Sequence, residues 1–314
     1  MPLLEKAFAV VIAIYVIFFI SSCAGSKPKG PPHKRIGWTA ENFFDDPNVI
    51  SVCHAIERKD AAEIERLIKA GVDVNTIGNK GMTLLLWSLP MGEEIFEKML
   101  QLGADPNIPF TDYLRVGGKG DAVISVAASQ NLVCKTMFHD ISMDNYLKLV
   151  LKHGGNPNYI NNHNGKSLLF ILDRGNVETR LDQLIQAGCN LDHQDPQRFS
   201  AALRLASSSY LLTYKLLEAG ADYRIINDFG FDLVITIASG EARFIKSCKE
   251  RGIDYDNDDR FNLRKNYLAL IIEFFEKEGV NYSAAQQSIG DPKLREYIEL
   301  PVEKRPWFPE YNSE

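Results

Sequence analysis

The sequence has few of the residues that metal and thiol chemistry require. It contains five cysteines and six histidines among 314 residues. None of them stands at the spacing of a zinc site, and Cys53 and His54 are an isolated neighbouring pair. Four cysteines follow Cys23 along the chain: Cys53, Cys134, Cys189 and Cys248. We expect them to be free thiols, although an oxidising compartment would permit disulfide bonds.

Catalytic motifs are also missing. Residues 164–167, Asn-Gly-Lys-Ser, are similar to the end of a phosphate-binding loop, but Ile160 stands where its first glycine is required. Residues 254–259 are similar to a calcium loop, yet Asp259 replaces its central glycine and Lys265 its bidentate glutamate. There is no Gly-x-Ser-x-Gly turn for a nucleophilic serine. We therefore predict that the protein is not an enzyme and has no cofactor, metal or small-molecule substrate.

An excess of positive charge is the third thing the chain lacks. Its formal net charge is −6. Glu5 and Lys6 cancel, and removing the four positive charges of residues 24–40 leaves −10 on residues 36–314. Nucleic-acid binding needs a basic surface, so this composition argues against a nucleic-acid partner. It is compatible with a basic protein partner.

What the sequence does contain is a recurring phrase, a glycine followed two residues later by Asp or Asn. We call it the Gly-x-Asx phrase, and its glycines are Gly71, Gly103, Gly154, Gly188, Gly220, Gly252 and a weaker Gly279. The steps between them are 32, 51, 34, 32, 32 and 27 residues. A period near 33 predicts stacked repeats. Such stacks serve as binding surfaces more often than as active sites.

Each phrase follows an apolar helical stretch, such as Ile64, Leu67 and Ile68 before Gly71. Glycine suits the left-handed backbone just beyond a helix, and Asp or Asn suits a turn. A second landmark opens the next helix, with Thr83, Ser167, Ser200 or Asp232 as the expected N-cap. Together the landmarks resemble the ankyrin repeat, although the Pro and His of its Thr-Pro-Leu-His motif are absent.

The resemblance implies an all-α ankyrin-repeat solenoid of about six to seven helix-turn-helix repeats, with short β-turn fingers. We place the repeats at 41–282, with an N-terminal cap at 46–75, where Asp46 and Pro47 begin the first helix. A C-terminal cap and Pro-rich tail follow at 283–314. The capping segments are expected to close the core with a polar outer face.

The 51-residue step indicates two insertions, one near 109–120 and one near 130–143. Insertions in repeat proteins fall in surface loops, often on the binding side. Two interpretations stay open for the first: tolerated drift of a loop, or a loop specific to a partner. In the second case Tyr113 and Arg115 are the expected contacts.

The N-terminus predicts the compartment. Residues 1–22 have a basic Lys6 before an apolar stretch of signal-peptide length, too short to span a bilayer. The following Ile20-Ser-Ser-Cys23-Ala24 resembles the bacterial lipobox, which implies a lipidated Cys23 and a palmitate-type membrane anchor. The alternative is an uncleaved signal anchor with an incidental Cys23. Ala24 resembles lipoproteins sent to the outer rather than the inner membrane, and residues 23–40 are predicted to be a flexible linker facing the periplasm.

Ankyrin stacks bind through their fingertips, and the expected contacts here are Asn79, Lys80, Tyr113, Arg115, His163, Asn164, Gln197, Arg198, Asp228 and Phe229. The layout from Gly37-Trp38 through Pro47 to Gly81-Met-Thr-Leu-Leu-Leu-Trp87 also resembles ankyrin-repeat lipoproteins that act as immunity proteins against type VI secretion lipase effectors. That resemblance implies a toxin inhibitor that binds a phospholipase or lipase in the periplasm. The alternative is an envelope scaffold or assembly factor that binds a resident protein.

Overall fold

The computed structural model describes residues 32–35, 37–114, 116–129, 145–172 and 176–310. The predicted signal peptide, Cys23, Arg115 and the insertion at 130–143 lie outside the described residues. The α-helices are α2 (Pro32–Arg35), α3 (Pro47–Glu57), α4 (Ala61–Lys69), α5 (Leu84–Ser88), α6 (Glu93–Gln101), α7 (Val123–Ser129), α9 (Tyr146–Lys152), α10 (Val177–Gln186), α11 (Ala201–Leu205), α12 (Tyr210–Glu218), α13 (Leu233–Glu250), α14 (Asn262–Lys277), α15 (Tyr282–Ser288) and α16 (Leu294–Glu299). The 3₁₀ helices are η1 (Ala40–Asn42), η2 (Asn79–Gly81), η3 (Leu89–Met91), η4 (Leu168–Ile171), η5 (Asp259–Phe261) and η6 (Val302–Lys304).

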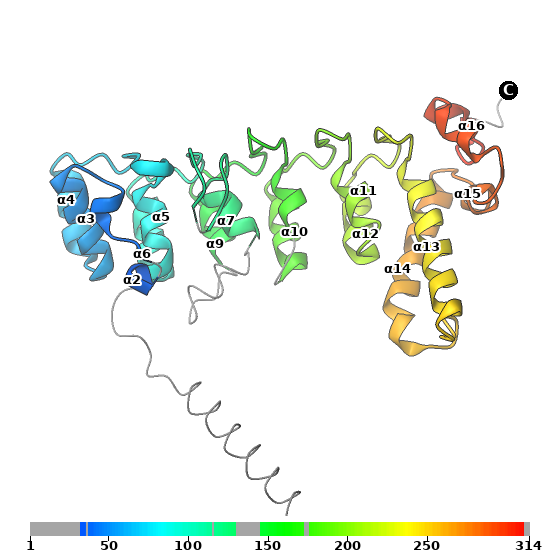
Figure 1. Cartoon of the computed structure of the whole chain (residues 1–314), viewed down its shortest axis with the longest axis horizontal. Helices are drawn as coiled ribbons and strands as arrows, with labels where there is room; N and C mark the ends of the chain where they lie inside the picture. The colour runs from blue at the N-terminus through cyan, green and yellow to red at the C-terminus, as the bar shows by residue number, and fades with distance from the viewer. Residues whose placement is uncertain (1–31, 36, 115, 130–144, 173–175, 311–314) are drawn as a thin grey trace, which may run out of the picture.

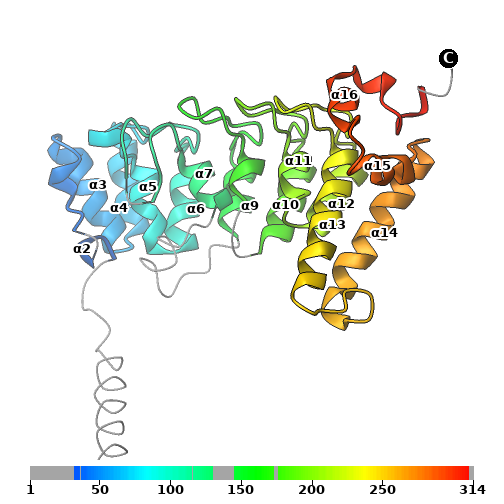
Figure 2. The same ribbon diagram turned by 45° about the vertical axis from the view of Figure 1, so that its right-hand side comes forward.

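Helix pairs stand side by side in one row, joined at one edge by long turns (Figures 1 and 2). The pairs are α3–α4, α5–α6, α7–α9, η4–α10, α11–α12 and α13–α14. A continuous apolar core runs through them from Trp38 to Phe308. Among the described residues there is no β-strand, and the turns contain only isolated bridges such as Ile77 with Thr83. The predicted all-α ankyrin-repeat solenoid is therefore confirmed, with six helix pairs in the described part of the chain.

The first helix of most pairs begins at the predicted polar residue. The Thr83 hydroxyl accepts the Leu86 amide at 3.1 Å, and the Asp232 carboxylate accepts the Ile235 amide at 2.9 Å. Asp46 likewise accepts the Asn48 amide at 2.8 Å, with Pro47 as the first helical residue. The prediction is wrong for Ser167, whose side chain makes no capping bond. The segment that follows it is the 3₁₀ helix η4, which has a tighter geometry than the α-helix that the pattern predicted.

The Gly-x-Asx phrases join the repeats in a ladder of amide hydrogen bonds. Within each of the first five phrases the first Asp or Asn accepts the amide two residues on, as Asp73 does from Asn75 at 2.9 Å. The second Asn then reaches the next phrase: Asn75 accepts the Asp105 amide at 2.7 Å and donates to the Gly103 carbonyl at 3.1 Å. The later rungs run from Asn107 to Asn156 and Gly154, from Asn158 to Asn190 and Gly188, and from Asp192 to Asp222.

Removing one rung should destabilise the stack. Asn107→Ala deletes the bonds to the Asn156 amide, 2.8 Å, and to the Gly154 carbonyl, 3.0 Å. We expect the free energy of unfolding to fall by about 1–2 kcal/mol, measured by urea denaturation. The matched control is Asn257→Ala, because the Asn257 side chain bonds only the nearby Asp254, at 2.8 Å. Equal losses in the two variants would show that the ladder adds nothing between repeats.

The last helix pair differs from the sequence prediction. Gly252 was assigned to a further repeat, but α13 runs unbroken for 18 residues and Gly252 lies in the turn between α13 and α14. This turn is at the edge opposite the other phrases, because α13 and α14 form a long hairpin that extends past the stack (Figures 1 and 2). α14 packs against α12, the second helix of the preceding pair. The helix α14 therefore has the position of the second helix in its own repeat. The phrase that closes this repeat is therefore the weaker one at Gly279.

Residues 301–309 fold back onto the last repeat. The Arg305 guanidinium donates to the Asp232 carboxylate at 2.7 Å and to the Gly230 carbonyl at 2.8 Å. The Trp307 indole N–H donates to the same carboxylate at 3.1 Å. Asp232, Arg305 and Trp307 are all at most 1% exposed. The Pro-rich tail thus closes the apolar core at this end, while α16 lies beyond the fingers (Figure 1).

The predicted linker is part of the fold where it can be described. His33 and Trp38 are 0% and 6% exposed, so residues 32–35 and 37–40 are packed against the stack and are not a flexible spacer. The His33 ring stacks on Trp87 with 4.1 Å between ring centroids, and its Nε2 lies 2.6 Å from the Trp87 carbonyl oxygen. Trp38 also stacks on Trp87, with 6.1 Å between ring centroids. Burial of these aromatic rings outweighs the Pro and Gly content from which a linker was predicted.

Docking of this segment should depend on pH. Burial lowers the pKa of His33 from 6.5 to about 4, and the bond to the Trp87 carbonyl only partly opposes it. The docked segment therefore has its full stability above pH 6.5 and loses it as the pH falls toward 4, by about 3 kcal/mol in total. Urea denaturation between pH 7 and pH 4.5 measures the loss.

The control for this experiment is His33→Phe, which keeps an aromatic ring against Trp87 and removes the titrating group. We expect the pH dependence of the free energy of unfolding to be shallower in His33→Phe than in the natural protein over this range. Parallel curves for the two proteins would show that groups other than His33 cause the acid sensitivity.

Candidate functional site

The turns that join successive helix pairs form the finger edge, which comprises residues 72–83, 104–122, 155–167, 189–200 and 221–232. The fingertip residues predicted from the sequence lie on it and are exposed: Asn79, Lys80, Tyr113, His163, Asn164, Gln197, Arg198, Asp228 and Phe229. Arg115 lies outside the described residues. Tyr113 and Phe229 are 64% and 61% exposed, which is high for side chains of this kind. The structure thus places these residues along one edge of the stack.

A buried Asn or Asp holds each of three fingers. Asn161 accepts the His163 and Asn164 amides at 2.8 and 3.2 Å, and Asn227 accepts the Phe229 amide at 2.9 Å. Asp195 does the same for the finger between them. The sequence prediction missed these residues, although their spacing repeats the period of the glycines. They fix the shape of the fingers before any partner arrives, which lowers the entropy cost of binding.

The insertion at 109–120 is a packed part of the finger edge. Phe110 and Leu114 are 1% and 3% exposed. The Thr111 amide donates to the Lys80 carbonyl at 3.1 Å, and the Lys80 ammonium lies 3.8 Å from the Asp112 carboxylate. The loop therefore rests on the first finger and presents Tyr113 outward.

A cluster of three phenylalanines and an arginine connects the later repeats along the finger edge. We call Phe170, Phe199, Arg204 and Phe229 the aromatic–arginine patch. The Arg204 guanidinium is 4.8 Å from the ring centre of Phe199 and 5.9 Å from that of Phe170. Phe199 and Phe229 have ring centroids 6.1 Å apart. Tyrosine, tryptophan and arginine dominate the energetics of protein interfaces, and exposed phenylalanine is also enriched there.

Arg204 is held in place by Asp195. Its guanidinium donates to the Asp195 carboxylate at 2.5 Å, and its side chain remains 40% exposed. Burial alone would raise the pKa of Asp195, but Arg204 and the amides of Phe199 and Gln197 outweigh burial and lower that pKa. Asp195 is therefore ionised near neutral pH, and Arg204 is a fixed cation beside two aromatic rings. The sequence prediction did not single out Phe170, Phe199 or Arg204.

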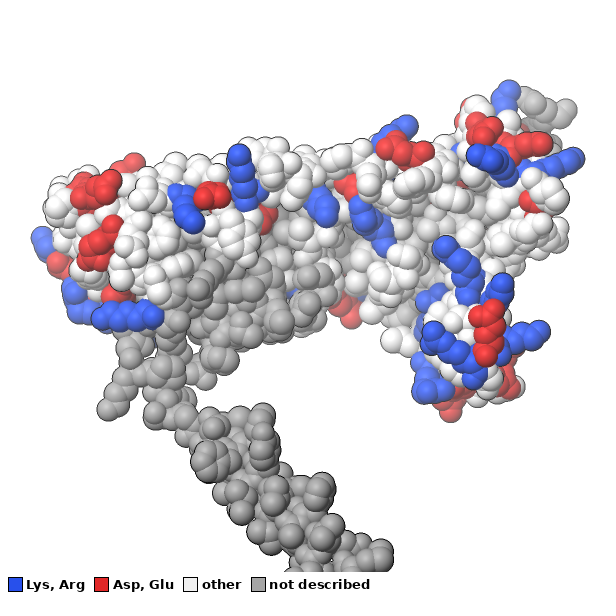
Figure 3. Space-filling view, in the orientation of Figure 1, with Lys and Arg blue, Asp and Glu red and all other residues white. Residues whose placement is uncertain are grey.

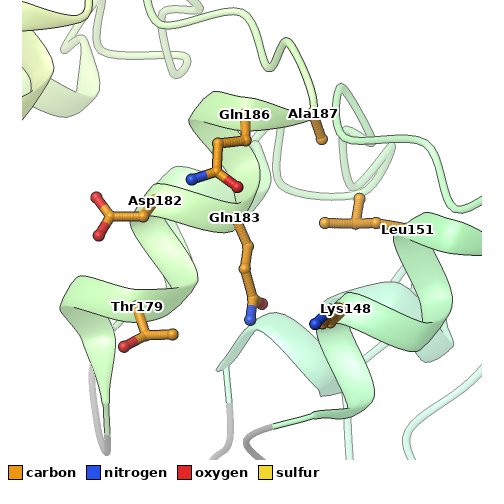
Figure 4. A pocket seen from close by; sticks show the side chains of 7 residues that line it. All are labelled: Lys148, Leu151, Thr179, Asp182, Gln183, Gln186 and Ala187. Atoms are coloured by element: carbon orange, nitrogen blue, oxygen red, sulfur yellow. The ribbon is translucent and has the colours of Figure 1, made fainter.

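A hollow of about 460 Å³ lies between α9 and α10 (Figure 4). Gln183 on α10 and Lys148 and Leu151 on α9 point into this space. Asp182 at its border accepts the Lys215 ammonium at 2.8 Å. Within the described residues no group of three His, Cys, Asp or Glu side chains could hold a metal ion. In the same part of the chain, no helix has both the length and the apolar character needed to cross a bilayer.

No family model matches the chain, and no curated protein matches it. Among solved structures, an ankyrin-repeat domain from Acinetobacter baumannii, ABAYE2397, is 20% identical, with 62% of this chain and 94% of that chain covered and a TM-score of 0.48. The ankyrin-repeat protein EF0377 is 16% identical, with 62% and 96% covered and a TM-score of 0.46.

A third solved structure is the complex of the Bdellovibrio bacteriovorus predatory endopeptidase Bd0816 with the immunity protein Bd3460. It matches with 16% identity, 62% of this chain and 93% of that chain covered, and a TM-score of 0.44. The fold assignment for the present chain rests on its own helix pairs, fingers and amide ladder. The exposed fingers and the aromatic–arginine patch have the composition of a protein-binding surface.

Proposed function

We propose that this protein is a membrane-anchored immunity protein whose finger edge binds and blocks an effector enzyme in the periplasm. The observation that carries the proposal is the row of exposed finger residues, with Tyr113 and Phe229 presented on turns that buried polar residues hold rigid. Rigid aromatic side chains beside a fixed arginine favour recognition of another protein.

The nature of the effector and the anchor come from the sequence resemblance. The proposed effector is a type VI secretion phospholipase or lipase, and the proposed anchor is lipidated Cys23 at the outer membrane. Inhibition would be stoichiometric, with the finger edge covering the mouth of the effector's active site or its membrane-docking surface. Anchoring would raise the inhibitor's effective concentration at the membrane that the enzyme attacks.

A competition assay between sibling bacteria tests the proposal. Cells that lack this gene should be killed by siblings carrying the lipase encoded beside it, and a plasmid copy of the gene should restore survival. Equal survival with and without the gene would refute the immunity role. The binding itself is measured separately, by titrating the purified lipase with this protein and following hydrolysis of a phospholipid substrate.

The anchor has its own experiment. Cys23→Ala should move the protein from the membrane fraction to the soluble periplasmic fraction and reduce protection, while the purified variant still inhibits the lipase. Cys53→Ala is a matched control, because Cys53 is a buried cysteine on α3. Unchanged fractionation and protection in Cys23→Ala would remove the anchor from the proposal and leave the binding role intact.

A further inference from the structure

A small hollow lies between two neighbouring fingers, beside the aromatic–arginine patch. Its volume is about 160 Å³, and its wall includes Pro157, Ile160, Ser167, Leu169, Cys189 and His193. An apolar cavity of ~150 Å³ is large enough to hold benzene, so this hollow matches one aromatic side chain in size. His193 also packs edge-on against Phe170, with 6.2 Å between ring centroids, which joins the hollow to the patch.

The wall of the hollow has no Asp, Glu, Lys or Arg, and its polar members are Asn158, Ser167, Asn190 and His193, of which only Ser167 has a buried side-chain atom that lacks a partner among the described residues. The Ser167 side chain is 6% exposed, and its hydroxyl has no hydrogen-bond partner among the described residues. Burial raises the pKa of the Cys189 thiol to about 11, so the thiol is uncharged near neutral pH. A buried hydroxyl without a partner is unfavourable, and an incoming polar atom would remove that cost.

The two fingers that form the hollow, and the finger before them along the chain, each carry one cation. Lys119 is on the preceding finger, Lys166 is next to Ser167 in the sequence, and Arg198 is on the finger that carries His193. None of the three makes an ion pair within the described residues, whereas Arg204 is paired with Asp195. Asp192, in the Gly-x-Asx turn beside them, is engaged in the amide ladder. Figure 3 shows Lys and Arg side chains along the fingered half of the stack, with Asp and Glu side chains between them.

We propose that this surface binds an acidic segment of the partner protein and takes one tyrosine side chain of that segment into the hollow. The ring fills the apolar space beside Ile160 and Leu169, and the phenolic hydroxyl bonds the Ser167 hydroxyl. Carboxylates on either side of the tyrosine lie against Lys119, Lys166 and Arg198. This inference rests on the proposed role of the finger edge as a binding surface, and it names the chemistry of the segment that binds there.

Tyrosine fits these features better than the other aromatic residues. Its ring has the size of the hollow, and its hydroxyl normally requires a partner once it is buried. Phenylalanine would fill the same space but leave the Ser167 hydroxyl unpaired. Three cations without partners favour an acidic partner over a basic one, because like charges brought together at an interface disfavour binding.

The test uses synthetic peptides and the purified full-length protein in detergent. The probe is a short peptide of alternating Glu and Asp with one central Tyr, and its counterparts have Phe in place of Tyr or Lys in place of every acidic residue. We expect the acidic Tyr peptide to bind about tenfold more tightly than the Lys peptide in fluorescence anisotropy at low salt. Binding should also shift the NMR signals of Ile160 and His193.

The Ser167→Ala variant distinguishes binding of the tyrosine in the hollow from general attraction between opposite charges. In the natural protein, replacing the peptide's Tyr with Phe should weaken binding about threefold to tenfold, and in Ser167→Ala the two peptides should bind equally. Lys166→Gln should weaken binding of both acidic peptides. Lys249→Gln, which removes an exposed charge on α13, is the matched control and should leave binding unchanged.

Three results would overturn the inference. They are equal binding of the acidic and Lys peptides, no binding of the acidic Tyr peptide, and a Tyr-to-Phe difference that persists in Ser167→Ala. None of these measurements uses the lipase. Peptide binding without protection in the competition assay would therefore support the proposed binding surface and refute the proposed effector. Protection without peptide binding would support the immunity role and refute the proposed tyrosine site.

Discussion

Replacing Asp232 with alanine should lower the free energy of unfolding by about 4 kcal/mol, one of the largest effects expected from a single substitution in this chain. The Asp232 carboxylate accepts the Arg305 guanidinium at 2.7 Å, the Trp307 indole N–H at 3.1 Å and the Ile235 amide at 2.9 Å. Asp232 and Arg305 are 0% and 1% exposed. Asp232→Ala therefore leaves the buried Arg305 guanidinium without its counter-charge and also removes the N-cap of α13.

A double substitution separates the lone charge from the lost contacts. In Asp232→Ala with Arg305→Met no buried charge remains, so we expect the double variant to be more stable than Asp232→Ala by about 1–3 kcal/mol. Urea denaturation followed by circular dichroism gives the three free energies. A loss below ~1 kcal/mol in Asp232→Ala would show that the C-terminal segment is not held by this pair.

The sequence predicted the repeat architecture well because each landmark has a local physical cause. Glycine past a helix and a polar residue before one are needed wherever a helix pair is repeated, so their spacing reports the stack directly. The same reasoning failed at Gly252, because a helix can also end in such a phrase at the tip of a hairpin. Arg224 carried the distinguishing signal: it stands where Asn75, Asn107, Asn158 and Asp192 make the rung to the next repeat.

The predicted fingertips are exposed because the turn between two landmarks connects helix pairs at the surface of the stack. Phe170, Phe199 and Arg204 were not predicted as site residues, because in a sequence an aromatic residue near a helix start looks like part of the core. Only the stacked repeats bring Phe170 of one unit within 5.9 Å of the Arg204 guanidinium of the next. The hollow lined by Ile160 is likewise formed by two neighbouring repeats, so the sequence of neither repeat alone indicates it.

Net charge and the distribution of charge along the fingers lead to different expectations for the charge of the partner. The sequence total of −6 was compatible with a basic partner, but a total averages over the whole surface. The amide ladder uses the carboxylates of Asp73, Asp105 and Asp192, while one cation stands on each of three successive fingers, at Lys119, Lys166 and Arg198. Recognition depends on the local field at the contact and not on the total charge, which is why the segment proposed above is acidic.

The second large effect is expected at Glu241, where the α13–α14 hairpin leaves the stack. Its carboxylate is 3% exposed and accepts the Tyr210 hydroxyl at 2.9 Å, the Arg264 guanidinium at 2.6 Å and the Tyr255 hydroxyl. Arg264 also lies between two aromatic rings, 4.2 Å from the ring centre of Tyr210 and 4.3 Å from that of Phe244. Glu241→Gln removes the negative charge and should cost about 3 kcal/mol.

This substitution also tests the assignment of the hairpin as the enlarged last repeat. Because α14 packs on α12 through this cluster, amide hydrogen exchange should accelerate in α12, α13 and α14 together, while α3 to α6 keep their protection. Glu273→Gln on α14 removes an exposed ion pair with Lys277, 2.9 Å, and should cost less than ~0.5 kcal/mol. If exchange accelerated in the hairpin alone and α12 stayed protected, the hairpin would be an appendage that the stack does not need. Acceleration that includes α12 would instead show that the hairpin stabilises the end of the finger edge carrying Phe229.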